Sequence, residues 1–394
     1  MKMQKIKLLS AVIIVLAVAA SPVAAGPTWE FGPNYEGLAK IEYKTQLWAA
    51  YRDSGSGTDS DDDTMEFNFR RNRLALMGAW EDWLSLYVQA EYQDDRNIGP
   101  ITVSDGGEKF YLLDAVMRFR YNDSLNLWAG KFKHVLTREN LEPCFGHLNL
   151  DRSYFIGTPL NDDGTRDKGV EVWGNLFEKR FQYRAAVTNG RNDSSSTPDS
   201  EFRYTVRGHL SLLDPEDHHG YDATYLGENK VLTIGGGYQF EDDVAFDNVT
   251  GQSGSVDYEG WTVDLFFEYP FEDIGTITLS GAYTDYDLDD AYQGVDPDPE
   301  TIGRNGEKNG SYGKVGYMLP NMPLQFFGRM ENWSFAQLDG VTDQEIDWYA
   351  GGFNYYIRGQ KLKLTMQYSS TEFDKEANNV EDFDTFITQL QLRF

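Results

Sequence analysis

The last stretch of the chain, DFDTFITQLQLRF (Asp382–Phe394), alternates between two faces up to its final residue. One face carries Phe386, Thr388, Leu390, Leu392 and Phe394, and the other carries Thr385, Gln389, Gln391 and Arg393, with Ile387 as the exception. A period of two predicts a β-strand. Chain ends in soluble domains are usually polar and frayed. A strand that runs to the last residue therefore needs a partner strand elsewhere in the chain.

The first residues, MKMQKIKLLSAVIIVLAVAASPVAA (1–25), predict a secretory signal peptide. Three lysines form the basic start, an apolar stretch spans 8–20, and Val23–Ala25 is a small-residue cleavage site. The apolar stretch is shorter than the roughly 20 residues that a transmembrane helix needs. We therefore expect the signal to be removed, so that the mature chain begins near Gly26.

The composition narrows the class of protein. A mean hydropathy of −0.53 excludes a helical membrane protein, but it is compatible with a barrel whose strands expose every second residue to lipid. The 24 Tyr, 24 Phe and 9 Trp suit aromatic girdles at the membrane interfaces. With Cys144 as its one cysteine, the chain has no disulfide framework and no site for a c-type haem. A formal charge of −28 argues against a nucleic-acid partner.

Sixteen alternating segments follow residue 37, most of them about ten residues long or slightly longer, which suits tilted strands that cross a bilayer. In WTVDLFFEY (261–269), for example, large apolar residues occupy one face and mainly polar ones the other. The segments span 38–52, 65–80, 83–94, 109–121, 125–134, 167–177, 181–189, 202–213, 231–241, 258–269, 275–287, 311–318, 322–335, 345–357, 361–371 and 383–394.

This pattern predicts an all-β protein, a 16-stranded antiparallel transmembrane β-barrel over 38–394 that follows a short periplasmic segment over 26–37. Short connections alternate with long ones, which places both termini in the periplasm and the long loops outside. The connection 214–230 departs from this rule because it is long on the short side. The last strand is expected to close against residues 41–49, since lipid cannot satisfy an open sheet edge.

Acidic runs such as DSDDD (59–63) and DLDD (287–290) lie in expected loops. They are interpreted either as solvated loops or as sites where divalent cations bridge to anionic lipopolysaccharide. Outer-membrane lipid and lipopolysaccharide are therefore the expected surroundings of the barrel.

Several motifs occur in an order that resembles the phosphate-selective porin O and P family. They are AGKFKHVLTRENL (129–141), RRNRL (70–74), LDAVMRF (113–119), RDKGVEVWG (166–174), GGFNYYIRGQKLKL (351–364) and the closing strand. The resemblance covers essentially the whole mature chain. It implies a homotrimer of barrels that conducts small solutes passively, with anion preference from inward arginines and a lysine cluster in an external loop. It also implies that the terminal aromatic, Phe394, acts as the signal for barrel assembly.

The connection 135–166 is expected to be the constriction loop, because so long a loop with few turn signals is best explained by folding into the lumen. It carries basic residues, but also Glu139, Glu142, Asp151, Asp162 and Asp163. The sequence shows no lysine-rich loop. We therefore expect passage of small anionic or neutral solutes with a modest anion preference, phosphate or another oxyanion included, without tight phosphate binding.

Successive residues of a strand point alternately into and out of the barrel, and this alternation, which we call strand parity, predicts which basic residues line the pore. Lys131 and Lys133, for example, alternate with Phe132 and are expected to face inward. The full set comprises Arg71, Arg73, Arg118, Arg120, Lys131, Lys133, Arg184, Arg203, Arg207 and Arg329 on the wall, with Arg138 and Arg152 on the loop. Unpaired, these residues would select anions. The alternative is that they pair with inward acids and brace the wall; the candidate acids are Glu42, Glu91, Asp114, Glu171, Asp264 and Glu268.

Other functions leave weaker traces in the sequence. No G-x-S-x-G or H-E-x-x-H motif occurs, so neither a hydrolase nor any other enzyme is expected, and no cofactor is expected either. His218 and His219 stand near acidic residues in the connection 214–230, which is either a polar loop or a metal site. Two further alternatives stay open: a barrel that sheathes partner cytochromes, and an uptake system dedicated to an oxyanion such as selenite.

Overall fold

The computed structural model describes residues 26–33, 36–56, 61–94, 98, 108–161, 164–191, 197–375 and 381–394. The expected signal peptide and the loop residues Asp162 and Asp163 lie outside these ranges. Within them, no helix is both long enough and apolar enough to cross a membrane.

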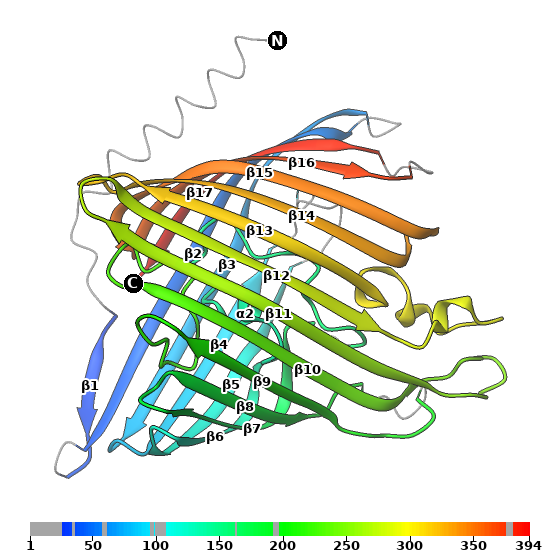
Figure 1. Cartoon of the computed structure of the whole chain (residues 1–394), viewed down its shortest axis with the longest axis horizontal. Helices are drawn as coiled ribbons and strands as arrows, with labels where there is room; N and C mark the ends of the chain where they lie inside the picture. The colour runs from blue at the N-terminus through cyan, green and yellow to red at the C-terminus, as the bar shows by residue number, and fades with distance from the viewer. Residues whose placement is uncertain are drawn as a thin grey trace.

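Sixteen strands, β2 to β17, form one antiparallel sheet that closes on itself, as predicted (Figure 1). A short strand, β1 (Thr28–Phe31), pairs with the start of β2. The strands of the barrel are β2 (Gly37–Ser56), β3 (Asp62–Trp80), β4 (Leu84–Gln93), β5 (Lys109–Asn122), β6 (Leu125–Lys133), β7 (Arg166–Leu176), β8 (Phe181–Thr188), β9 (Arg203–Ser211), β10 (Val231–Ala245), β11 (Val256–Phe271), β12 (Gly275–Asp287), β13 (Lys308–Met318), β14 (Leu324–Leu338), β15 (Val341–Gln360), β16 (Leu362–Phe373) and β17 (Phe383–Arg393).

The last strand closes the barrel against the first one. The register of β17 on β2 runs from Thr385 opposite Arg52 to Arg393 opposite Lys44. Beyond it, the Phe394 N–H donates to the Tyr43 carbonyl at 2.8 Å, and the Tyr43 N–H donates to the Phe394 carbonyl at 2.9 Å. The chain is therefore paired up to its final residue, which leaves no open edge between β17 and β2.

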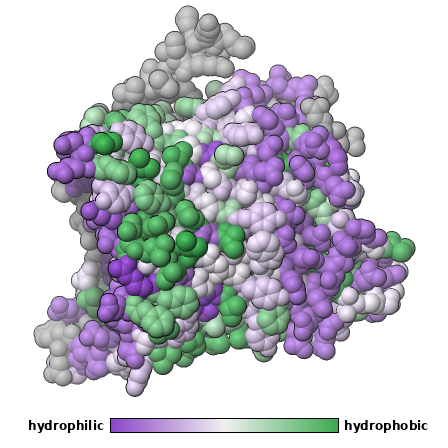
Figure 2. Space-filling view, in the orientation of Figure 1, coloured by the Kyte–Doolittle hydropathy of each residue, from purple (hydrophilic) through white to green (hydrophobic). Residues whose placement is uncertain are grey.

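The two faces of the sheet follow the alternation of the sequence. On β11, Trp261 and Val263 are 41% and 53% exposed on the outer surface, whereas Thr262 and Asp264 are 2% and 5% exposed inside. Figure 2 shows apolar residues gathered over the strands, and a predominantly hydrophilic end where the connection 288–307 lies. Lipid outside and polar groups inside impose this period of two on each strand.

One expected long loop is a tight turn instead. The connection after β14, predicted over 336–344, consists of Asp339 and Gly340 alone, because β14 and β15 continue as a hydrogen-bonded ribbon. Both residues have positive φ (50° and 83°), and Asp-Gly is the pair that two-residue hairpin turns favour. The backbone hydrogen bonds between β14 and β15 therefore continue beyond the residues in which apolar and polar side chains alternate.

Helical structure is confined to connections. The one α-helix among the described residues, α2 (Arg138–Leu141), is capped by Thr137, whose side chain accepts a hydrogen bond from the Asn140 N–H. Three 3₁₀ turns occupy the connection between β12 and β13: η1 (Ala291–Gln293), η2 (Pro299–Thr301) and η3 (Gly303–Asn305). The short helix α2 belongs to the connection between β6 and β7, which fills part of the lumen.

Candidate functional site: the lumen constriction

The connection between β6 and β7, residues 134–165, crosses the interior of the barrel. Its backbone carbonyls accept hydrogen bonds from lumen-facing side chains on strands around the wall. These bonds join Gln46 to Cys144 (3.1 Å), Gln391 to Phe145 (2.8 Å), Lys363 to His147 (3.0 Å), Asn354 to Leu148 (2.5 Å) and Arg207 to Leu136 (2.9 Å). The prediction of a constriction loop folded into the lumen is thus confirmed. Inward amide and cationic side chains thus donate the hydrogen bonds that the carbonyl groups of the loop would otherwise accept from water.

Buried ion pairs anchor this constriction loop to the barrel wall at two places, at β13 and β14 and at β3. Glu139 accepts two hydrogen bonds from Arg329 on β14, at 2.6 and 3.2 Å, and lies 2.5 Å from the Lys314 ammonium on β13. Burial alone would raise the pKa of the Glu139 carboxyl, but the charges of Arg329 and Lys314 hold it at about 2. At the other side of the loop, Asp151 pairs with Arg70 and Arg71 on β3, each at 2.5 Å.

A second segment, residues 212–230 between β9 and β10, enters the lumen from the end that carries the short turns. It contains the connection 214–230, which is long although it lies on the side of the short turns. Its Glu216 receives two hydrogen bonds from Arg138 of the constriction loop, both at 2.7 Å. The Tyr225 N–H donates to Glu268 on β11 at 2.9 Å. The two inward segments therefore hold each other on the side of the barrel formed by β8 to β11.

His219 of this second segment is engaged with the wall. Its imidazole lies 2.8 Å from the Glu171 carboxylate on β7 and stacks on Trp128 of β6, with ring centroids 3.5 Å apart. Burial lowers the pKa of His219 to about 4, against the opposing charge of Glu171. No group of three potential metal ligands occurs within the described ranges. His219 and Glu216 thus belong to the packing of the lumen.

Most of the predicted pore arginines have carboxylate partners. The pairs are Arg71 with Asp151 (2.5 Å), Arg73 with Glu91 (2.9 Å), Arg138 with Glu216 (2.7 Å), Arg184 with Glu171 (3.8 Å), Arg203 with Glu241 (2.6 Å), Arg207 with Asp264 (2.7 Å) and Arg329 with Glu139 (2.6 Å). The partners of Arg73, Arg184 and Arg207 are acids that the bracing alternative named. The other four arginines pair with acids that it did not name, which are Asp151, Glu139, Glu216 and Glu241. The carboxylates of the wall and of the two inward segments thus largely neutralise the charges of these arginines.

Three predicted residues have a different environment. The Arg118 guanidinium lies over the Trp128 ring at 4.2 Å and near Tyr87 at 5.0 Å. The Lys133 ammonium donates to the Glu142 backbone carbonyl at 2.6 Å, and Arg152 donates to the Asn140 side-chain oxygen at 3.1 Å. In the part of the chain that the structure describes, none of these three cations forms an ion pair with a carboxylate. They are the candidates for attracting an anion.

Two predicted positions lie outside the constriction. The parity expected for Lys131 is wrong: Phe132 is 2% exposed and lines the lumen, whereas Lys131 is partly exposed and donates to the Leu112 carbonyl at 3.3 Å. Lys133, at the end of β6, reaches the interior beside it. Arg120 lies near the turn after β5, where its side chain is 61% exposed and pairs with Asp123 at 2.7 Å. It stands at the rim rather than at the narrow part of the pore.

Sequence parity also missed Arg70. The register of β2 on β3 shifts between Gln46, opposite Arg71, and Leu47, opposite Phe69, so Arg70 forms a bulge. A bulge adds one residue to one strand and redirects the side chains around it. Arg70 and Arg71 consequently both reach Asp151. The sequence holds one signal of this, the consecutive arginines in an otherwise alternating strand.

A cavity of about 330 Å³ lies between the constriction loop, the second segment and the wall formed by β2 to β7. We call it the wall cavity. Asp114 is its one carboxylate among the described residues, and that carboxylate pairs with Arg166 at 3.0 Å. The cationic side chains that line it are Lys44, Arg73, Arg118, Lys133 and Arg166. The passage along this wall is therefore lined mainly by positive charge.

Cys144, the one cysteine of the chain, lines the wall cavity from the constriction loop. Burial alone would raise the pKa of its thiol, but the charges of Arg73, Lys133 and Arg71 hold the pKa well below its usual range. The thiol thus reports a positive potential at this point of the loop.

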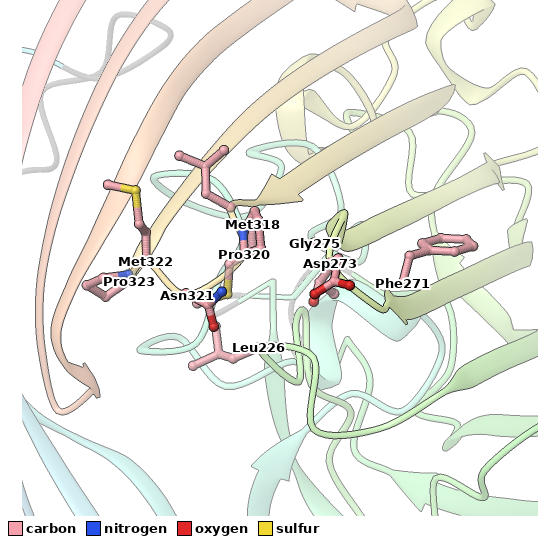
Figure 3. Close-up of a pocket in the computed structure, with 11 residues that line it drawn as sticks. Leu226, Phe271, Asp273, Gly275, Met318, Pro320, Asn321, Met322 and Pro323 are labelled. Atoms are coloured by element: carbon pink, nitrogen blue, oxygen red, sulfur yellow. The ribbon is translucent and has the colours of Figure 1, made fainter.

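A second recess, of about 450 Å³, lies among the short turns at one end of the barrel (Figure 3). It is lined by Leu226 of the second segment and by residues of the turns after β11 and β13, such as Pro320 and Met322. Asp273 is its one charged residue among the described residues. It therefore lacks the cations that make the wall cavity a candidate site.

Known proteins with the same architecture were found by sequence and by structure. The model of the family described as "Phosphate-selective porin O and P" matches residues 41–394. Pseudomonas putida OprB superposes with a TM-score of 0.62 at 12% identity, over 90% of this chain and 94% of that one. An anion-selective porin from Comamonas acidovorans gives 0.58 at 13%, over 91% and 100%. A trimer form of OmpT from Vibrio cholerae gives 0.52 at 12%, over 91% and 99%.

Proposed function

Because the chain belongs to the phosphate-selective porin O and P family, we propose that this outer-membrane porin lets small hydrophilic solutes diffuse passively with a modest preference for anions. The observation that carries the preference is the wall cavity. There, Arg118 and Lys133 face the passage without a carboxylate partner among the described residues. The description of the family as phosphate-selective and of the Comamonas acidovorans porin as anion-selective supports the same sign of selectivity.

The net charge of the chain does not set this preference. Charge on loops that face bulk solvent is screened within about 8 Å at physiological salt. The field at the narrow part comes from the residues that line it, inside low-dielectric walls that concentrate it. Because most lumen arginines are paired, the excess there is small. The sequence also has no lysine cluster to replace the hydration shell of phosphate. The preference is therefore modest, and phosphate or other oxyanions pass without tight binding.

A passive pore suits the lumen better than a sheath around partner cytochromes. A sheath needs an open interior that another protein can enter. Here the constriction loop and the second segment cross that interior and are held together by Arg138 and Glu216. The wall cavity beside them, of about 330 Å³, has the size of a small solute. The same argument leaves a dedicated oxyanion carrier as a narrower version of the proposed function.

The assembly and the surroundings are part of the proposal. A homotrimer in outer-membrane lipid and lipopolysaccharide is supported by the family and by the trimer form of OmpT from Vibrio cholerae. Export through a cleaved signal peptide over 1–25, with 26–37 as a short periplasmic segment, is supported by the sequence.

The zero-current potential across a planar bilayer in a KCl gradient tests the selectivity. We expect a zero-current potential of the sign that a higher permeability for chloride than for potassium gives. A unit charge about 4 Å from an ion contributes about 1 kcal/mol in water, so the double change Arg118→Gln and Lys133→Gln lowers the ratio of chloride to potassium permeability several-fold. Arg120→Gln, at the rim, is the matched control and leaves the ratio unchanged. Potassium preference in the unmodified protein would show that the acidic loops dominate, which contradicts the proposal.

A further inference from the structure

The wall cavity contains a cation that the wall does not neutralise. Arg118 extends from β5 over the Trp128 ring, and its Nε is buried without a hydrogen-bond partner among the described residues. The imidazole of His219 stacks on the same indole. These contacts hold the guanidinium against the indole while its Nε–H has no partner within the described residues, so the group is preorganised to bind an anion.

The cavity also has an apolar part. Val116 and Phe132 on the wall are each 2% exposed, and Leu141 of the constriction loop is 4% exposed. All three line the cavity beside Arg118 and Lys133, and Pro143 lies next to them. Apolar side chains around a few placed charges are typical of pockets for organic ligands rather than of water-filled channels. The volume, about 330 Å³, falls within the range of roughly 300–1,000 Å³ for such pockets.

Resting on the proposed function, we propose that the wall cavity is a binding site for carboxylates with an apolar body that pass through the pore. The carboxylate would accept hydrogen bonds from the Arg118 guanidinium, whose fork matches two carboxylate oxygens, with Lys133 as the second cation. The apolar body would lie against Phe132 and Leu141. The site would thus be a waypoint in the passage, deep enough to hold the solute and open enough to release it.

An inorganic oxyanion fits the cavity less well. Phosphate presents hydrated oxygens on every side, so it loses hydrogen bonds wherever it meets Val116, Phe132 or Leu141. The other cations that line the cavity are already engaged, as in the pairs of Arg73 with Glu91 and Arg166 with Asp114. Two cations beside apolar side chains suit a monoanion with an apolar body, such as benzoate.

Block of chloride current by benzoate in planar bilayers tests the site. We expect benzoate to reduce the current at a lower concentration than acetate or inorganic phosphate. A hydrogen bond to a charged group contributes enough that Arg118→Gln should raise the half-blocking concentration of benzoate about tenfold or more. Phe132→Ala should weaken block by benzoate but not by acetate. Arg120→Gln, on the same strand but outside the cavity, should match the unmodified protein.

Calorimetric titration of benzoate into the unmodified protein in detergent provides a second measurement that needs no variant. Binding is expected, and its absence would overturn the site. A protein that binds benzoate but forms no channels would contradict the proposed function and keep the site. Channels that conduct normally, with benzoate no more effective than acetate or with phosphate equally effective, would overturn the site and keep the proposed function.

Discussion

Deletion of Phe394 is expected to reduce the amount of assembled protein in the outer membrane about tenfold or more, while export continues. The deletion removes both backbone hydrogen bonds that join Phe394 to Tyr43 and close the barrel beyond the register of β17 on β2. Backbone groups left unpaired at a lipid-facing seam cost several kcal/mol each, and about 1.4 kcal/mol corresponds to a tenfold change. It also removes the terminal aromatic that we propose as the assembly signal.

The measurement is the amount of heat-modifiable barrel in the outer-membrane fraction, compared with unassembled protein in the periplasm. Phe394→Lys separates the two effects of the deletion, because it keeps the backbone pairing and removes only the aromatic side chain. Phe177→Lys is the control, since Phe177 is 77% exposed in a turn away from the seam. Outer-membrane levels equal to those of the unmodified protein in the deletion variant would show that the closing strand does not direct assembly.

Glu139→Gln is expected to raise the single-channel conductance several-fold by freeing the constriction loop. The change keeps the shape of the side chain but removes the charge that Arg329 and Lys314 share in a fully buried site. Removing one partner of a buried ion pair typically costs about 3–5 kcal/mol, because the other charge stays buried. Arg329 keeps Glu331 at 2.6 Å, so the strand is less affected than the loop.

Conductance in symmetric KCl measures the effect, with heat modification as a check that the barrel is intact. Glu345→Gln is the matched control, because Glu345 lies exposed on β15. Larger and more variable current steps are expected for Glu139→Gln alone. Steps of unchanged size would mean that the carbonyl contacts of the loop, such as those from Gln391 and Lys363, hold it without the ion pair.

The strands could be predicted because the two faces of each strand keep the same environment along its length. Lipid on one face and polar groups on the other leave a strict period of two, as on β11 and in the closing strand, so the number of strands and their order follow from the sequence. Parity fails wherever one residue is inserted, since a shift of one position moves every later side chain to the other face. Arg70 in its bulge is such a case. Lys131 is a different one, because the register of β6 has no shift at Lys131, and the alternation alone did not show that Phe132 faces the lumen.

The partners of the pore residues could not be predicted in the same way. The pairing of Arg329 with Glu139 joins a strand to a loop 190 residues away in the chain, and it depends on how the loop crosses the lumen. The entry of residues 212–230 into the barrel was also not predicted. The sequence holds two signals of this entry. The connection is long although it lies on the side of the short turns, and inward polar residues such as Gln182 and Glu171 find hydrogen-bond partners in this segment.

We propose that solutes pass between the constriction loop and the wall of β2 to β7, where cationic side chains line the wall cavity. The rate at which Cys144 reacts with negatively and positively charged methanethiosulfonate reagents of similar size tests it most directly, because Cys144 is the one cysteine of the chain and lines the wall cavity. We expect faster reaction with the negative reagent and a fall in conductance once the thiol is modified. Faster reaction with the positive reagent, or a modified protein that conducts as before, would contradict it.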